Sequence, residues 1–300
     1  MARGVRTFLR PPRLASLERA REQLASSSRS TVFVQDGERL LRAWGPPERP
    51  FALAVEPSSD RWAVEAYGVG PVAARRAVRE LFSLEDDLGA FYRRVRNEPV
   101  LRGTERRFRG LRLPRDANLY EALLHAIVGQ QLSVASANAI TRRLVARFGR
   151  SLDAGGIDVP VLPAPDELVS AGASGLRSVG LSRAKARALL GVGAWSSRAP
   201  TLGQLRRASA DDARAELERL PGVGPWSAEN ALLRGAGRTD IFVAGDLGVR
   251  VALERFGAVA REAPESDARA WAARHYAGWG SYATLYLWRR LVTEVAARAG

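Results

Sequence analysis

The segment from Leu220 to Arg250 reads LPGVGPWSAENALLRGAGRTDIFVAGDLGVR, and it decides how the rest of the sequence is interpreted. Pro221 to Gly224 interrupt an apolar-periodic segment, and Pro225 stands where the first turn of a helix tolerates proline. The pattern predicts two helices joined by a glycine hairpin, together covering residues 212–233.

This hairpin is predicted to bind phosphate. Glycine allows the backbone to approach a partner closely, and the second helix directs its unpaired N–H groups to the same side. The donors would be the main-chain N–H groups of Gly222, Gly224 and Trp226. A lone acid, Asp246, follows shortly after an apolar run. We therefore expect a phosphate-binding backbone with a carboxylate beside it, and a plain glycine corner between packed helices is the alternative.

The composition favours a polyanionic partner. The chain has 300 residues, enough for two domains, and 46 basic against 32 acidic residues give a net charge of +14. No apolar run approaches a membrane span, and the start, MARGVRTFLRPPR, lacks the apolar core of a signal peptide. The chain has no cysteine and two histidines, His125 and His275, which excludes thiol chemistry and disfavours a histidine-rich metal centre.

Two regions are expected. Residues 1–97 contain a hairpin signature around Asp36-Gly37, where Asp-Gly suits a type I′ turn, followed by two more strand-like runs and two helical patterns. They predict an antiparallel α+β lobe. From Tyr120 to the end only helical patterns with glycine stops are found, so residues 98–300 are predicted to form an all-α domain in which residues 149–165 are a loop.

Three blocks, in order, resemble the helix–hairpin–helix/Gly-Pro-Asp superfamily of DNA glycosylases, and most of all its bacterial 3-methyladenine DNA glycosylase II branch. They are YEALLHAIVGQQLSV (Tyr120–Val134), the opening segment through Asp246, and WGSYATLYLW (Trp279–Trp288). The resemblance implies a helical helix–hairpin–helix DNA glycosylase domain, with residues 1–97 as the extra sheet lobe of that branch.

By this resemblance the essential acid is Asp246. Breaking an N-glycosidic bond builds oxocarbenium charge on the sugar, which a carboxylate can stabilise while it orients the attacking water. The alternative is that Asp246 only caps the helix that starts at Leu247. Asp240 is the nearest rival acid, and we interpret it as a turn or cap residue.

Trp226 stands where bifunctional members of the superfamily carry a Schiff-base lysine. Amine catalysis needs a neutral amine, and the only lysine of the chain, Lys185, lies among arginines elsewhere. The interpretation is a monofunctional enzyme that leaves an abasic site.

The resemblance also assigns residues around a flipped base. Trp226 and Trp288 match aromatic pocket positions, Tyr282 is near, and Asn230 and Arg289 replace tyrosines of some relatives. Gln131, or else Leu132, would fill the gap left by the flipped base. His125 is expected in the core. The carbonyls of three hairpin residues match those that hold a monovalent cation in relatives: Glu218, Leu220 and Val223.

The sequence thus predicts a monomeric, cytoplasmic and nucleoid-associated enzyme that excises alkylated bases of the 3-methyladenine and 7-methylguanine type from duplex DNA. No metal or organic cofactor is expected beyond that structural cation. One alternative is a glycosylase for oxidised or deaminated purines. The other is a non-catalytic helix–hairpin–helix DNA-binding module, which would need neither an acid after the hairpin nor a tryptophan pocket.

Overall fold

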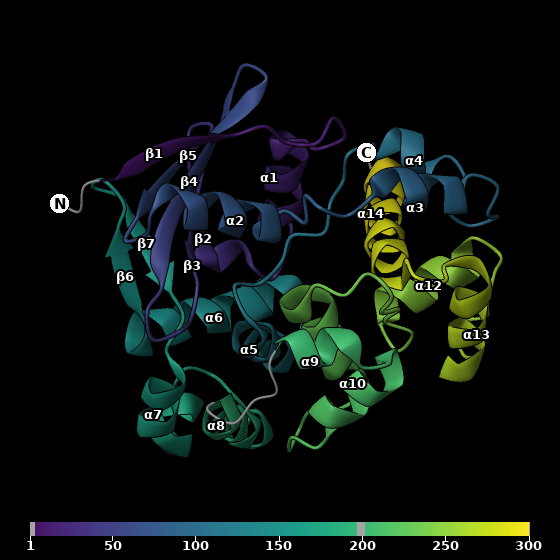
Figure 1. Cartoon of the computed structure of the whole chain (residues 1–300). Coiled ribbons are helices and arrows are strands. Elements are labelled where there is room, and N and C mark those ends of the chain that lie inside the picture. Colours follow the sequence, from purple (N-terminus) through teal and green to yellow (C-terminus); the bar gives the residue numbers. More distant parts are fainter. Residues whose placement is uncertain (1–3, 197–201, 300) are drawn as a thin grey trace.

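The computed structural model describes residues 4–196 and 202–299, with side chains up to residue 295, so the first three residues of the chain lie outside the described part. The N-terminal region forms a five-stranded antiparallel sheet in the order β1-β5-β4-β3-β2 (Figure 1). Its strands are β1 (Val5–Leu9), β2 (Phe33–Asp36), β3 (Arg39–Trp44), β4 (Phe51–Ser58) and β5 (Arg61–Tyr67).

The predicted hairpin is strands β2 and β3, but its turn differs from the expected one. Asp36 pairs with Arg39, which leaves a two-residue loop of Gly37 and Glu38. Only Gly37 has a positive φ there, +57°. A type I′ turn needs positive φ at both central residues, so the expected turn type is wrong although the hairpin is confirmed.

The sheet is covered on both faces because its strands alternate apolar side chains between two cores. On one face Leu53 and Val55 of β4 pack with helices α1 (Leu17–Ala25) and α2 (Pro71–Leu81). On the other face Ala52 and Ala54 pack against a second hairpin, β6 (Arg150–Asp153) and β7 (Asp158–Val161). The prediction of a loop over residues 149–165 is therefore wrong. The exposed residues of this strand pair are polar, so the alternation of apolar and polar residues that marks a strand was not evident in the sequence.

The boundary between the two cores lies earlier than residue 97. The sheet core ends at Leu84, and α3 (Leu88–Val95) packs in the helical core instead. Its Phe91 ring lies 4.9 Å from that of Tyr286, centroid to centroid. Figure 1 shows α3 and the short α4 (Thr104–Arg107) beside α14 (Gly280–Ala299), away from the sheet.

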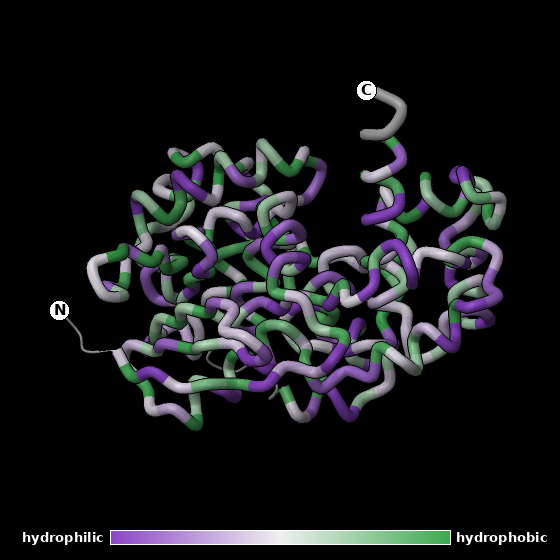
Figure 2. Tube along the Cα trace, turned by 90° about the horizontal axis from the view of Figure 1, so that it is seen from above, coloured by the Kyte–Doolittle hydropathy of each residue, from purple (hydrophilic) through white to green (hydrophobic). Residues whose placement is uncertain are grey.

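The remaining chain is helical, apart from the β6–β7 hairpin, as expected. A π-helical turn, η2 (Leu232–Ala236), directly follows α11 (Pro225–Ala231). Figure 2 shows hydrophobic and hydrophilic residues interspersed along most of the trace. The helices are α5 (Leu119–Gly129), α6 (Val134–Phe148), α7 (Pro165–Ser178), α8 (Arg183–Ser196), α9 (Leu202–Arg207), α10 (Ala210–Glu218), α11 (Pro225–Ala231), α12 (Leu247–Arg255), α13 (Glu265–His275) and α14 (Gly280–Ala299). Among the described residues, no helix combines the length and the apolar character needed to cross a bilayer.

Candidate active site

Asp246 is the N-cap residue of α12, and its carboxylate accepts three N–H donors. Oδ1 accepts from the main-chain N–H of Val249 at 3.0 Å, as in an ordinary helix cap. The indole Nε1–H of Trp288 donates to the same oxygen at 2.7 Å, and that of Trp226 donates to Oδ2 at 3.0 Å. Hydrogen bonds therefore hold both carboxylate oxygens in place. Asp246 caps α12, as the alternative expected, and the same carboxylate is also oriented by the two indoles.

Gly248 lets Trp288 lie close to this carboxylate. A Cβ at Gly248 would lie 3.3 Å from Trp288 Cδ1 and 3.2 Å from Asp246 Oδ1, which leaves little room for a larger residue. The Trp226 ring passes beside Gly129, the last residue of α5, at an ordinary packing distance of 3.8 Å from where a Cβ would stand. Three helices, α11, α12 and α14, meet at Asp246.

A cavity of about 370 Å³ opens beside Asp246, within the size range of small-molecule sites. Both predicted tryptophans and Asn230 line it, and so does Leu132, whose side chain is 39% exposed. The N-terminal lobe supplies one wall, formed by Gln23, Ser26, Ser27, Ser28 and Arg29. The cavity is therefore built by both parts of the molecule.

The cavity wall carries buried polar groups. Arg29 makes a buried ion pair with Asp116, with Nε 2.8 Å from Oδ1. Burial alone would raise the pKa of Asp116, but Arg29 and His125 outweigh burial and hold it well below its usual range. Arg234, 3% exposed, donates from Nη1 to the carbonyl of Pro114 at 2.8 Å. His125 is buried as expected, and it also lines the cavity.

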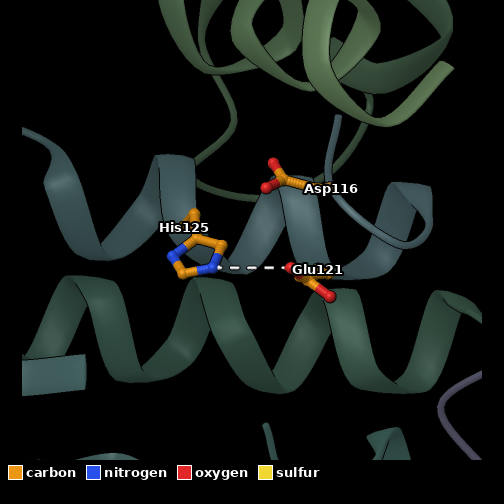
Figure 3. Close-up of side chains that lie close together, drawn as sticks. All are labelled: Asp116, Glu121 and His125. Carbon is orange, nitrogen blue, oxygen red and sulfur yellow. Dashed lines mark ion pairs between the residues drawn. The ribbon is translucent and has the colours of Figure 1, made fainter. Parts of the chain in front are cut away.

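Asp116, Glu121 and His125 bring ligand-type atoms within 4.8 Å of one another (Figure 3). Both carboxylates already face arginines, because Asp116 pairs with Arg29 and Glu121 pairs with Arg42. Two guanidinium groups that close to the oxygens repel a metal ion. The group is therefore an ion-pair network between the lobes rather than a candidate metal centre.

Tyr282 does not reach the cavity, which corrects its expected place in the base pocket. Its side chain is fully buried, and its hydroxyl donates to Asp86 Oδ2 at 2.8 Å. Burial, followed by the charge of Asp86, raises the pKa of Tyr282 well above its ordinary value. On α14, Tyr282 lies six residues before Trp288, and the turns between them direct it into the helical core.

The predicted wedge residues lie at the junction between α5 and α6. Gln131 is exposed and has a φ of +54°, a left-handed backbone conformation that is uncommon for glutamine. The neighbouring Gln130 donates from Nε2 to the carbonyl of Gly222 and to Ser227 Oγ, both at 2.9 Å. The junction is thus tied to the glycine hairpin, which the sequence did not indicate.

Lys185 supports the same junction. Its Nζ donates to the carbonyls of Gln130 at 2.7 Å and Val128 at 2.9 Å, at the C-terminal end of α5. Burial lowers its pKa. The ammonium group does not line the cavity, so the one lysine of the chain has a structural position away from Asp246.

The hairpin has the expected form. Gly222 has a φ of +79°, and a Cβ there would lie 2.7 Å from Ala188, so both the turn and the packing require glycine. Gly224 is exposed, with open space where a side chain would stand. The Leu220 carbonyl accepts the N–H of Val223 at 3.0 Å. The cation at the carbonyls of Glu218, Leu220 and Val223 stays a prediction.

Asp240, the rival acid, belongs to a different place. It pairs with Arg238, whose Nε donates to Oδ1 at 2.8 Å, and it lines a separate cavity near α13. Asp246 is the carboxylate in the cavity with the tryptophans.

Sequence reasoning missed the arginines of the cavity. Arg29, Arg234 and Arg289 all line it. In a chain so rich in arginine, no spacing or run of charge distinguished these three. Asn230, predicted in the base pocket, does line the cavity, whereas Arg289 is distinguished in the sequence only as a replacement of tyrosine.

Comparisons with known proteins show the family to which the chain belongs. Residues 124–274 match the family described as HhH-GPD superfamily base excision DNA repair protein. A DNA-3-methyladenine glycosylase of Bacillus subtilis (strain 168) is 28% identical over 215 residues, 71% of each chain. A probable bifunctional transcriptional activator/DNA repair enzyme AlkA of Mycobacterium tuberculosis (strain H37Rv) is 32% identical over 222 residues, 73% of this chain and 43% of that protein.

The solved structure of a 3-methyladenine DNA-glycosylase from Archaeoglobus fulgidus is similar over nearly the whole chain. Its TM-score is 0.83 at 25% identity, covering 95% of this chain and 98% of the other. The chain therefore belongs to the HhH-GPD superfamily of base excision DNA repair proteins, as the three blocks predicted. The match also confirms the sheet lobe followed by a helical domain.

Proposed function

We propose that the protein is a monofunctional DNA glycosylase that excises alkylated bases from duplex DNA and leaves an abasic site. The observation that carries the proposal is the Asp246 carboxylate, held by two indole N–H groups at the edge of a cavity of about 370 Å³. The names of its relatives in Bacillus subtilis and Archaeoglobus fulgidus support alkylated purines as the substrates.

In this proposal the damaged nucleotide leaves the base stack, and its base enters the cavity next to the rings of Trp226 and Trp288. The bond between C1′ and the base nitrogen breaks, and the base takes the electron pair. The fixed carboxylate of Asp246 stabilises the positive charge that develops on the sugar. Water then adds to C1′ and loses a proton. The carboxylate needs little reorganisation because its donors already hold it.

The hairpin and the overall charge support duplex DNA as the partner. Gly222 and Gly224 are exposed, and backbone N–H donors at such a turn bind phosphates without reading sequence. A net charge of +14 favours the approach to DNA. Gln131 and Leu132, which lie at the junction tied to this hairpin, are proposed to fill the space of the flipped base, and the enzyme is proposed to act as a monomer.

The test of this proposal is Asp246→Asn. Asparagine remains a good N-cap, so the fold is retained, but the negative charge is lost. We expect the single-turnover release of 3-methyladenine from a duplex to fall by about a thousandfold or more, while the Kd for the same duplex changes little.

Asp240→Asn is the matched control, because this acid lies in another cavity and should leave base release close to the wild-type rate. Undiminished release by Asp246→Asn would contradict the assignment. A wild-type protein that binds DNA but releases no base would instead support the DNA-binding module.

The absence of lyase activity is a separate prediction. Lys185 donates to two main-chain carbonyls, and Trp226 occupies the position where lyases carry a lysine. Sodium borohydride added during turnover should therefore trap no covalent complex between protein and DNA on a denaturing gel. Efficient trapping would overturn the monofunctional part of the proposal but not the glycosylase part.

A further inference from the structure

Exposed apolar residues gather at the opening of the cavity. Leu132, Val134 and Val292 line the cavity, although they are 39%, 49% and 56% exposed. Leu247, 69% exposed, directly follows Asp246. A side chain that lines a cavity and is still exposed lies at its mouth rather than in its depth. We call these four residues the apolar collar.

The collar is contributed by separate elements that meet only in the folded protein. Leu132 and Val134 lie at the start of α6, Leu247 is the first residue of α12, and Val292 lies on α14. Of the nine large apolar residues that are exposed in the described part of the chain, four belong to the collar. Such residues gather on a surface mainly where a partner covers them.

The collar offers few hydrogen-bond donors to phosphate groups. Three arginines line the same cavity, but Arg29 and Arg234 are buried, and Arg289 pairs with Glu22. Phosphates are bound by exposed donors, which the hairpin provides elsewhere. The sugar rings and the faces of the bases are the less polar parts of DNA, and the base faces are accessible only where the stack is broken. The collar therefore suits distorted DNA.

The proposed reaction brings such DNA to the collar. The C1′ atom of the damaged nucleotide has to approach the carboxylate of Asp246, and the Cα of Leu247 is only about 3.8 Å from that of Asp246 along the chain. Leu132 follows Gln131, the residue proposed to fill the gap left by the flipped base. The sugar and its unstacked neighbours would thus cover the collar.

We propose that the apolar collar binds the sugar of the damaged nucleotide and the unstacked bases beside it, so that the protein prefers duplexes that are distorted at the lesion. This inference rests on the proposed glycosylase function and adds three residues to its DNA surface: Val134, Leu247 and Val292. The hairpin holds the phosphates of any duplex, whereas the collar distinguishes a distorted site from regular DNA.

The experiment compares wild type with the triple variant Val134→Thr/Leu247→Asn/Val292→Thr by fluorescence anisotropy. Each substitution nearly keeps the shape of the side chain but replaces apolar atoms by polar ones. One duplex carries a tetrahydrofuran abasic analogue, and the other is the same duplex without damage. We expect the Kd of the analogue duplex to rise about tenfold and that of the undamaged duplex by less than about twofold.

Salt dependence gives a second readout. Because the collar contacts no phosphate, the slope of log Kd against the logarithm of the salt concentration should be the same for the variant and the wild type. A shallower slope in the variant, an equal rise of both Kd values, or no rise at all would overturn the inference.

Val5→Thr/Val72→Thr/Val169→Thr is the matched control. These three valines are also exposed, but they lie on β1, α2 and α7 and do not line the cavity. The control should bind both duplexes like wild type, and a loss equal to that of the collar variant would overturn the inference. If the triple collar variant does not fold by circular dichroism, Val292→Thr alone is judged by the same comparison of the two duplexes.

A second copy of the chain is the other partner that an apolar surface could bind. Self-association of the wild type in sedimentation experiments, lost in the collar variant while both Kd values stay unchanged, would overturn the inference. The binding test needs no base release, so the two proposals fail separately. A wild type that releases no damaged base contradicts the proposed function, whereas base release with an unchanged Kd in the collar variant contradicts only the role of the collar.

Discussion

At the scale of single residues, the three donors to Asp246 have different origins. The main-chain N–H of Val249 belongs to the helix cap and would exist in any capped helix. The indole groups of Trp226 and Trp288 are additional, and they approach from two other helices. The indoles fix the orientation of the carboxylate, while their rings form the adjacent cavity wall.

Trp288→Phe separates these two roles. Phenylalanine keeps an aromatic ring for stacking but lacks the N–H that donates to Asp246 Oδ1. Single-turnover base release should fall about tenfold, the scale of one charge-assisted hydrogen bond. Trp279→Phe is the control, because Trp279 packs on Phe91 and Tyr282 in the core. Equal losses from both substitutions would mean that general packing, and not the bond to Asp246, matters.

At the scale of elements, the junction between α5 and α6 is held from two sides. Lys185 donates to the last carbonyls of α5, and Gln130 donates to the glycine hairpin. Between them Gln131 keeps a left-handed backbone with its side chain exposed. A strained, exposed residue next to a cavity is a reasonable candidate for a part that acts on DNA.

Gln131→Gly should therefore act in opposite directions on stability and activity. Glycine adopts the positive φ without strain, so the free energy of unfolding should rise by up to about 1 kcal/mol. Base release from duplex DNA should fall about tenfold if the side chain fills the gap left by the flipped base. Release from a single-stranded lesion should change little.

Ser59→Gly controls for the backbone effect. Ser59 has a nearly identical φ of +53° in the turn between β4 and β5, far in sequence from the cavity residues. Its substitution should change stability in the same direction while leaving base release unchanged. If Gln131→Gly releases bases from duplex DNA as fast as wild type, Leu132 rather than Gln131 would be the residue that fills the gap left by the flipped base.

At the scale of the whole molecule, several ion pairs connect the N-terminal lobe to the helical domain, and two of them differ sharply in exposure. Arg29 and Asp116 have side chains that are 9% and 0% exposed, whereas Arg289 and Glu22 are 22% and 46% exposed. Buried and exposed pairs differ strongly in what their disruption costs. Both pairs also lie at or next to the cavity.

Asp116→Asn should lower the free energy of unfolding at pH 7 by about 3–5 kcal/mol, because it leaves the Arg29 charge buried and unpaired. Glu22→Gln, the exposed counterpart, should cost no more than about 1 kcal/mol. Urea denaturation measures both. Equal effects of the two substitutions would contradict this account of the lobe interface.

The pH dependence of the buried pair follows from the depressed pKa of Asp116. The folded protein holds this pKa below its ordinary value of 3.8, so the stabilisation is fully present above about pH 4 and is lost as the pH falls further. The difference in stability between wild type and Asp116→Asn should therefore shrink below pH 3.8.

The sequence alone predicted the parts whose signal is local. The hairpin at Gly222, the cap at Asp246 and the strands around Gly37 depend on residues close together in the chain. The position of Tyr282 was predicted wrongly because residues on adjacent turns of α14 face different sides of the helix. When most residues of a helix are apolar, the sequence does not show which side faces the core and which faces the cavity. The β6–β7 hairpin and the wall from Gln23 to Arg29 depend on packing between distant segments. Arg234 could not be distinguished among so many arginines.

The bond between Trp226 and Asp246 also bears on how this enzyme could have diverged from lyases that share its fold. A lysine at position 226 would remove one donor from the carboxylate and one wall of the cavity in the same step. A new amine would thus arise in a site that had lost one of the indole donors to Asp246. An evolutionary path between the two chemistries therefore requires compensating substitutions around Asp246 before, or together with, the exchange at position 226.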